Sequence, residues 1–318
     1  MNYIKNAQNS FFKSYIPAKM IKKINYNHSL IFFISCIFLS SFDYLRSNSF
    51  ILICFFLILI LGVSHGALDN IKGRKLIKIL KIKNISYFYL VYIFIGLGIV
   101  LLWILFPQSL LLLFLIIASY HFGKEDSEFI SKNKKESFFL KTFKGSIIIV
   151  SPLLFNQNKT LEIFNSINFD LSNTLLVKIE FLVILLFLSF ISNLILSFNK
   201  NYDEKSILFM DFFSIITLNI FLNPLLAFTI YFCFLHSFRH SIKLIFELNK
   251  NFKIGIFLFI KKALPLTFIT GIIFIVALNF LNYEFKLNES VNMVIFIGLA
   301  SLTFPHILLE YLIEKNEK

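Results

Sequence analysis

Long apolar stretches separated by short polar loops follow one another along the whole chain. Ten of them approach the roughly 20 residues that an α-helix needs to cross a lipid bilayer. They cover approximately residues 28–45, 50–67, 87–106, 109–126, 139–156, 174–197, 206–222, 225–244, 264–281 and 291–312. The pattern predicts an all-α fold, a polytopic transmembrane helix bundle of about ten spans. The range is eight to ten, because the fourth and fifth stretches are the weakest.

Composition supports a protein that folds in lipid. The 318 residues are 57% hydrophobic and 18% aromatic, and only 15% are charged. A soluble domain of this length does not need so much apolar surface, whereas a bundle of membrane helices does. We expect one membrane helical domain at 28–313, a polar basic N-terminal segment at 1–27 and a short C-terminal tail at 314–318.

The net charge of +13 predicts an orientation in the membrane. Nucleic-acid binding would require a basic patch on a soluble module, so no nucleic-acid partner is expected. If ten helices alternate, the loops on the opposite side hold Arg46, Lys159 and Lys286. Most other basic residues fall in loops on one side, among them Lys5, Lys13, Lys19, Lys22, Lys23, Lys124, Lys132, Lys134, Lys135, Lys243, Lys250 and Lys253. By the positive-inside rule, both termini are predicted to be cytoplasmic.

Five of the six histidines lie near the ends of even-numbered predicted helices. They are His65, His121, His236, His240 and His306. Even-numbered helices all end on the same side, so these side chains come to a similar depth and can meet. A single histidine in an apolar helix is ordinarily a core residue with a partner. Five at one level favour a shared site, because ionisable groups inside a membrane face the bundle interior and serve a function.

The motif HSFRH places His236 and His240 four residues apart. On a helix this spacing puts two side chains on one face, which suits chelation of a single metal. A site made of imidazoles suits iron, copper or zinc, and the residues alone do not choose among them. Haem held by paired histidines also stays open. A zincin is excluded because the chain has no HExxH motif.

Three histidines are followed four residues later by a carboxylate. The residues that follow His65, His121 and His306 are Asp69, Glu125 and Glu310, respectively. Each carboxylate could accept a hydrogen bond from the ring nitrogen that a metal does not use. Alternatively, Glu125 and its neighbour Asp126 are ordinary acidic residues of a helix end at the water boundary.

Asp211 and Arg239 are charges within predicted helices, where charges are rare. Either could be a partner of the histidine site, and the two could pair with each other. Arg239 could equally extend to the cytoplasmic interface.

The motifs HGALD (65–69), YHFG (120–123), HSFRH (236–240) and PHILLE (305–310), in this order, resemble those of the bacterial Brp/Blh β-carotene 15,15′-dioxygenases. The resemblance extends over about residues 60–312. It implies a non-haem enzyme that uses O2 to split β-carotene at its central double bond into two molecules of retinal. One departure is Ser64, which stands where proline is expected before the first histidine.

The resemblance also implies a cofactor and site residues. Fe(2+) would be held by the residues at the matching motif positions, namely His65, His121, His236 and His240. Around this metal or against the substrate we expect His306, Asp69, Glu310 and Glu125. No catalytic group beyond the metal centre is implied.

The resemblance further implies an integral protein of the bacterial inner (plasma) membrane. Membrane lipid would deliver β-carotene sideways into an aromatic tunnel, and the retinal product would pass to a rhodopsin-type protein. Candidate wall residues of the tunnel are Tyr120, Phe122, Phe234 and Phe238. Two alternatives stay open: an oxygenase acting on a different carotenoid, and a transporter or channel with a histidine proton relay or metal site. The broken, symmetry-related helices of a transporter are not evident.

Overall fold

The computed structural model describes residues 18–130, 137–169, 174 and 177–316. Several expected features lie outside the described residues: positions 1–17 of the basic N-terminal segment, positions 317–318 of the tail, and Lys132, Lys134 and Lys135. For His65 the backbone is described and the side chain is not.

Every apolar stretch of the sequence coincides with a helical segment, and the described residues contain no β-strand, so the all-α prediction is confirmed. Eight stretches are single helices: α2 (Ala18–Leu39), α5 (Ser86–Leu105), α6 (Pro107–Glu125), α7 (Phe138–Phe155), α9 (Ile179–Ser197), α10 (Tyr202–Phe221), α13 (Phe252–Leu281) and α14 (Leu287–Asn316). Two are composite: α3 (Ile51–Leu57) with η3 (Ile58–Gly62) and η4 (Val63–Leu68), and α11 (Pro224–Ile230) with η6 (Tyr231–Ser237) and α12 (Phe238–Leu248). Shorter elements are η1 (Asp43–Arg46), η2 (Asn48–Phe50), α4 (Asp69–Ile79) and α8 (Gln157–Ser166).

Two helices begin well before the apolar pattern does. α2 was expected from about 28 and α13 from about 264, but they start at Ala18 and Phe252. The extra turns of α2 carry Lys22, whose ammonium pairs with Glu204 on α10. α13 is capped by Asn251, whose side chain accepts hydrogen bonds from two backbone N–H groups of the first turn. Caps and ion pairs, rather than hydropathy, therefore set these helix ends.

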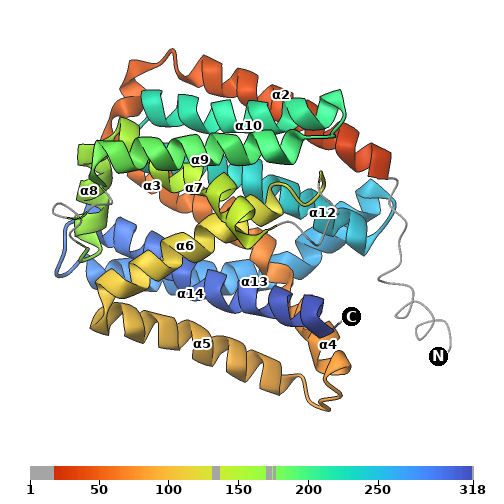
Figure 1. The fold of residues 1–318 in the computed structure, drawn as a ribbon. Helices are drawn as coiled ribbons and strands as arrows, with labels where there is room; N and C mark the ends of the chain where they lie inside the picture. The colour runs from red at the N-terminus through yellow and green to blue at the C-terminus, as the bar shows by residue number, and fades with distance from the viewer. Residues whose placement is uncertain (1–17, 131–136, 170–173, 175–176, 317–318) are drawn as a thin grey trace.

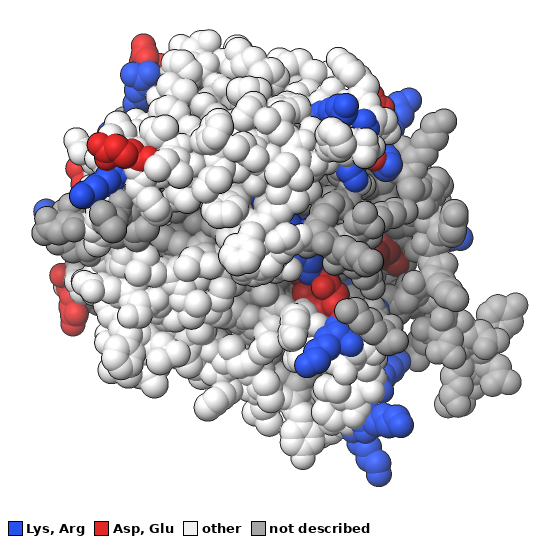
Figure 2. Space-filling view, viewed as in Figure 1, with Lys and Arg blue, Asp and Glu red and all other residues white. Residues whose placement is uncertain are grey.

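Five helices of the described residues are long and apolar enough to cross a membrane: α5, α7, α9, α13 and α14. In Figure 2, charged side chains gather towards two ends of the molecule and leave a broad uncharged middle. The long helices run across this middle, and the first turn of α2 and the last turn of α14 lie at the same end (Figure 1). These features indicate a membrane protein. The number of spans and the side of the termini remain predictions.

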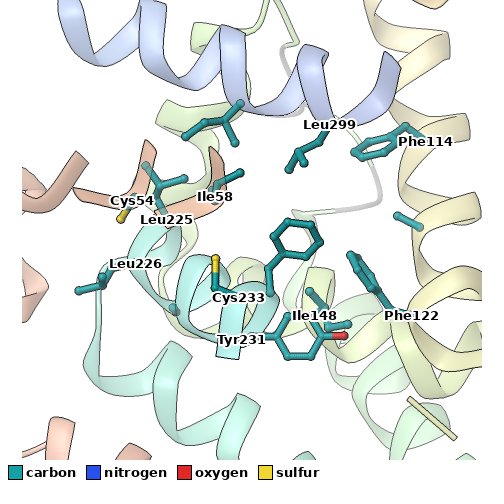
Figure 3. Close-up of a cluster of buried hydrophobic side chains, with 14 of the residues drawn as sticks. Cys54, Ile58, Phe114, Phe122, Ile148, Leu225, Leu226, Tyr231, Cys233 and Leu299 are labelled. Atoms are coloured by element: carbon teal, nitrogen blue, oxygen red, sulfur yellow. The ribbon is translucent and has the colours of Figure 1, made fainter. Parts of the chain in front are cut away.

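The largest buried cluster fills the middle of the bundle (Figure 3). Figure 3 shows Phe114 and Phe122 of α6 facing side chains of α7, η6 and α14. Cys54 and Cys233 belong to this cluster as buried free thiols. In lipid, close packing of this kind supplies much of the attraction between helices.

Helices α6 and α7 approach each other at backbone distance. A Cβ atom at Gly123 would collide with the carbonyl oxygen of Lys141, and one at Gly145 would collide with that of Ser119. Small residues allow such contacts between membrane helices. His121 lies between Ser119 and Gly123 on α6, so the crossing fixes the position of its ring along the bundle.

Two neighbouring segments, η3 and η6, are π-helical. They lie side by side, because the Ser237 hydroxyl donates to the Gly62 carbonyl at 3.4 Å and a Cβ atom at Gly62 would meet the ring of Phe232. π-Helical turns are wider than α-helical turns and often occur at functional sites. Here the wide turn of η6 includes His236, so this side chain points in a direction that a regular α-helix would not give it.

Candidate metal centre

Four buried histidine rings meet near the C-terminal end of α14. The ring of His121 lies 5.4 Å from that of His236 and 5.5 Å from that of His306, centroid to centroid. The rings of His306 and His240 are 6.1 Å apart. These side chains come from α6, η6, α12 and α14, so the topology gathers residues that are distant in sequence. The backbone of His65 lies in η4, which packs against η6 and α14.

The two histidines of the i,i+4 pair in HSFRH have different ring neighbours. His236 contacts the ring of His121, whereas His240 contacts the ring of His306. Each member of the pair therefore has its own neighbour on another helix.

Carboxylates fix the orientation of three rings through their Nδ1 atoms. The Nδ1 atom of His236 lies 2.9 Å from Asp126 Oδ1, that of His240 lies 2.5 Å from Glu125 Oε2, and that of His306 lies 2.8 Å from Asp69 Oδ2. An ionised carboxylate only accepts hydrogen bonds, so in a neutral ring Nδ1 carries the proton and Nε2 keeps its lone pair. This tautomer is the one that binds a metal through Nε2.

In two of these pairs the carboxylate is bonded to a histidine of another helix rather than to the histidine four residues before it in the sequence. Glu125 accepts from His240 on α12, and Asp69 accepts from His306 on α14. Glu310 does stay near its own histidine, with Oε1 3.7 Å from Nε2 of His306.

Asp126 is a site residue that the sequence analysis treated only as a helix-end acid. Its Oδ1 is bonded to His236 and its Oδ2 accepts from the Tyr231 hydroxyl at 2.6 Å. The adjacent acids Glu125 and Asp126 could have indicated this role. Successive residues on a helix project about 100° apart, so two adjacent carboxylates can reach two different histidines.

Two further groups support the carboxylates from α4 and α5. The Tyr92 hydroxyl donates to Asp69 Oδ2 at 2.8 Å, and Lys72 Nζ lies 2.6 Å from Glu310 Oε1. Burial acts to lower the pKa of Lys72, but the carboxylates of Glu310 and Asp69 raise it above its ordinary value. Lys72 is therefore a cation that offsets part of the acidic charge around the histidines.

The donor atoms of this cluster suit a metal ion. One ligand atom from each of His121, His306 and Glu310 lies within 4.8 Å of the other two. Imidazole nitrogens with a carboxylate oxygen form a donor set for divalent iron, zinc or copper. His306, expected beside the metal or against the substrate, thus lies directly in the cluster.

An apolar cavity of about 500 Å³ reaches His121 and His306. Phe122 lines it, as expected, together with aromatic side chains such as Phe114, Phe228 and Phe232.

Three of the four expected tunnel-wall residues do not line this cavity, so that part of the expectation was wrong. Tyr120 stacks on Phe138 of α7, and Phe238 stacks on His28 of α2. Phe234 is 40% exposed on the outer side of η6. These rings are close to a histidine in the sequence but do not line the cavity, because the helix face on which a residue lies decides where its side chain points.

Arg239 and Asp211 form a buried ion pair beside the cluster, which is one of the possibilities that the sequence left open. The guanidinium donates to Asp211 from Nη1 at 2.5 Å and from Nη2 at 2.8 Å, and Nη2 also donates to the Ser29 hydroxyl. Arg239 is therefore held inside the bundle and does not extend to the interface. The pair joins α12 to α10 and α2.

Comparisons with known proteins agree with the motifs. A family model described as beta-carotene 15,15'-dioxygenase matches residues 56–314. A curated protein of an uncultured marine bacterium 66A03, named beta-carotene 15,15'-dioxygenase, is 27% identical over 259 residues, which is 80% of this chain and 90% of that protein. No solved structure matches the chain. The matched region contains the four clustered histidines and the carboxylates bonded to them, and the chain belongs to the beta-carotene 15,15'-dioxygenase family.

Proposed function

We propose that this protein uses O2 to cleave the central double bond of β-carotene into two molecules of retinal. In this reaction each carbon of the broken double bond gains one oxygen atom, so both atoms of O2 enter the products. The observation that carries the proposal is a buried histidine cluster at the wall of an apolar cavity, in a chain of this family. The name of the relative from the marine bacterium supports β-carotene as the substrate.

We further propose Fe(2+) as the cofactor, with His65, His121, His236 and His240 as ligands. The Nδ1 hydrogen bonds support this, because a neutral ring that donates from Nδ1 offers the lone pair of Nε2 to a metal. Bound there, iron would supply the activation of O2. His306 has the same arrangement through Asp69, so it would act beside these ligands or against the substrate.

The chain itself positions the reacting groups. Phe122 meets the ring of His236 edge-on at 4.8 Å and Phe232 stacks on it at 5.9 Å, so this ring has little freedom to turn. β-Carotene carries no polar group, so the cavity must position it by shape and by aromatic contact. The same apolar walls exclude water from the bond that is broken.

The cellular setting follows from the proposed reaction. We place the protein in the bacterial inner membrane, where lipid dissolves the substrate, and expect the retinal to pass to a rhodopsin-type protein. The family match weighs against the transporter or channel alternative.

The proposed reaction predicts loss of pigment in a bacterial strain that makes β-carotene. Expression of the chain with iron and oxygen available should bleach the cells and yield retinal, because cleavage shortens the conjugated system. Chromatography of the extracts checks both substrate and product, and His121→Ala serves as the inactive control. Persistent colour without retinal would contradict the proposal, and products of unequal length would show cleavage at another bond.

The hydrogen bond from His240 on α12 to Glu125 on α6 predicts that Glu125, which is not a proposed metal ligand, affects the affinity of the site for the metal. Glu125→Gln should weaken iron binding by about tenfold, the lower end of the usual range, because the amide still accepts from His240 but carries no charge. Equilibrium dialysis with Fe(2+) measures this directly. Glu128→Gln is the matched control, since Glu128 pairs with Lys243 at 2.5 Å and its side chain is 44% exposed. Equal affinity in the two variants would remove Glu125 from any role at the metal.

A further inference from the structure

The cavity at the histidine cluster opens between α5 and α13. Four of its lining residues are Ile93 and Leu97 on α5 and Ile269 and Ile273 on α13. Their exposed fractions are 58%, 64%, 53% and 59%, respectively. Side chains that both line a cavity reaching His121 and are this exposed indicate that the cavity opens to the outside at this point.

The opening is a property of two helix faces rather than of single side chains. On α5 the lining positions include Tyr89, Ile93, Gly96 and Val100, which recur at helical spacing. On α13 they include Leu266, Ile269, Thr270 and Ile273, which follow the same rule. Each helix therefore presents a continuous strip to the cleft.

Helix α14 forms the floor of this cleft. Both α5 and α13 pack on α14. A Cβ atom at Gly96 would lie 3.2 Å from the Ser301 carbonyl oxygen, and one at Gly298 would meet the ring of Phe274. Along the floor, Leu302 and His306 lie one helical turn apart and both line the cavity. The floor thus leads from the opening to the cluster.

The surroundings of the opening are apolar. Among the five helices suited to crossing a membrane, α5 and α13 are the least buried inside the protein, at 11% and 6%. Exposed side chains near the opening, such as Phe94 and Phe268, are large and apolar. Such surfaces face lipid in a membrane protein, so a molecule that enters here comes from the hydrocarbon layer and not from water.

We propose that the cleft between α5 and α13, the lipid port, admits a long apolar polyene from the bilayer to the histidine cluster. The port is defined by Ile93, Leu97, Ile269 and Ile273. The identity of the polyene rests on the proposed function. At the inner end of the path stands Tyr92, which lines the cavity and donates to Asp69, the carboxylate that holds His306.

Tryptophan substitutions in the port test this inference. Leu97→Trp and Ile269→Trp place bulky side chains in the cleft without removing any contact of the histidine cluster. The matched controls, Leu101→Trp and Ile272→Trp, lie on the same helices, are 57% and 47% exposed, and are not among the residues that line the cavity. Each purified variant is given β-carotene in phosphatidylcholine liposomes, and pigment uptake, the initial rate of retinal formation and iron content are measured.

The port variants should take up pigment and form retinal several-fold more slowly than the wild type, while the controls match the wild type and iron content stays constant. Equal rates in all variants would overturn the port, as would an equal slowing in the controls. If the wild-type protein takes up β-carotene but forms no retinal, the proposed function fails, and uptake alone decides on the port. If the wild type takes up no β-carotene, the port for a polyene is overturned as well.

Discussion

His236→Ala should abolish both retained iron and retinal formation. The imidazole of His236 is 1% exposed, is held by Asp126 through Nδ1 and lies against the ring of His121. Its removal takes away a proposed ligand and leaves Asp126 without its ring partner. Elemental analysis of the purified protein and chromatography of the products measure the two losses independently.

The control for this variant is His28→Ala, because His28 lies outside the cluster and its Nε2 contacts the backbone carbonyl of Phe234 at 2.8 Å. It should keep iron and turnover. Full iron content in His236→Ala, in protein that elutes as a single species, would remove His236 from the metal. His306→Ala measured in the same way separates its two roles: loss of iron makes it a ligand, and retained iron with slower cleavage places it against the substrate.

Arg239→Met should lower the free energy of unfolding by about 3–5 kcal/mol, the cost of leaving one partner of a buried ion pair uncompensated. The Asp211 carboxylate would remain buried after losing both of its hydrogen bonds from the guanidinium. Asp211→Asn should be destabilising for the converse reason, with the charge of Arg239 left unbalanced. Thermal unfolding in detergent micelles, followed by circular dichroism, provides the measurement.

The double variant Asp211→Leu/Arg239→Met tests whether pairing causes the loss. Replacing both charges with apolar side chains removes the unbalanced charge, so the double variant should recover much of the stability lost by Arg239→Met. Strictly additive losses would show that Arg239 contributes through its other contacts, which include the Ser29 hydroxyl and the ring of Phe129.

The helical stretches could be predicted from hydropathy because lipid cannot satisfy backbone hydrogen bonds, so an apolar stretch in a membrane becomes a helix. The early starts of α2 and α13 could not, because the ion pair of Lys22 and the cap by Asn251 belong to polar surroundings. The π-helical turns were also missed. Nothing in YFCFLHS distinguishes a wide turn from a regular one before the packing of η6 against η3 is known.

The meeting of His121, His236, His240 and His306 was expected from an alternating topology, in which even-numbered helices end on one side. The partners of their Nδ1 atoms did not follow, because they depend on how far each helix is rotated about its axis. A one-residue difference such as Glu125 against Asp126 selects a different ring, and spacing along the chain does not report that rotation. The pairing of Asp211 with Arg239 could be named in advance as a possibility, since unpaired charges within membrane helices are costly.

The hydrogen bonds between carboxylates and histidines of distant helices also affect the order in which the site can assemble during synthesis. Asp69 lies in the first quarter of the chain and its partner His306 lies near the end. Glu125 is synthesised more than a hundred residues before its partner His240. A nascent chain that has released its early helices into the bilayer therefore lacks the histidine partners of these two acids. His306 can join the cluster only after the ribosome has delivered the final helix, so we expect a chain truncated before α14 to be inactive.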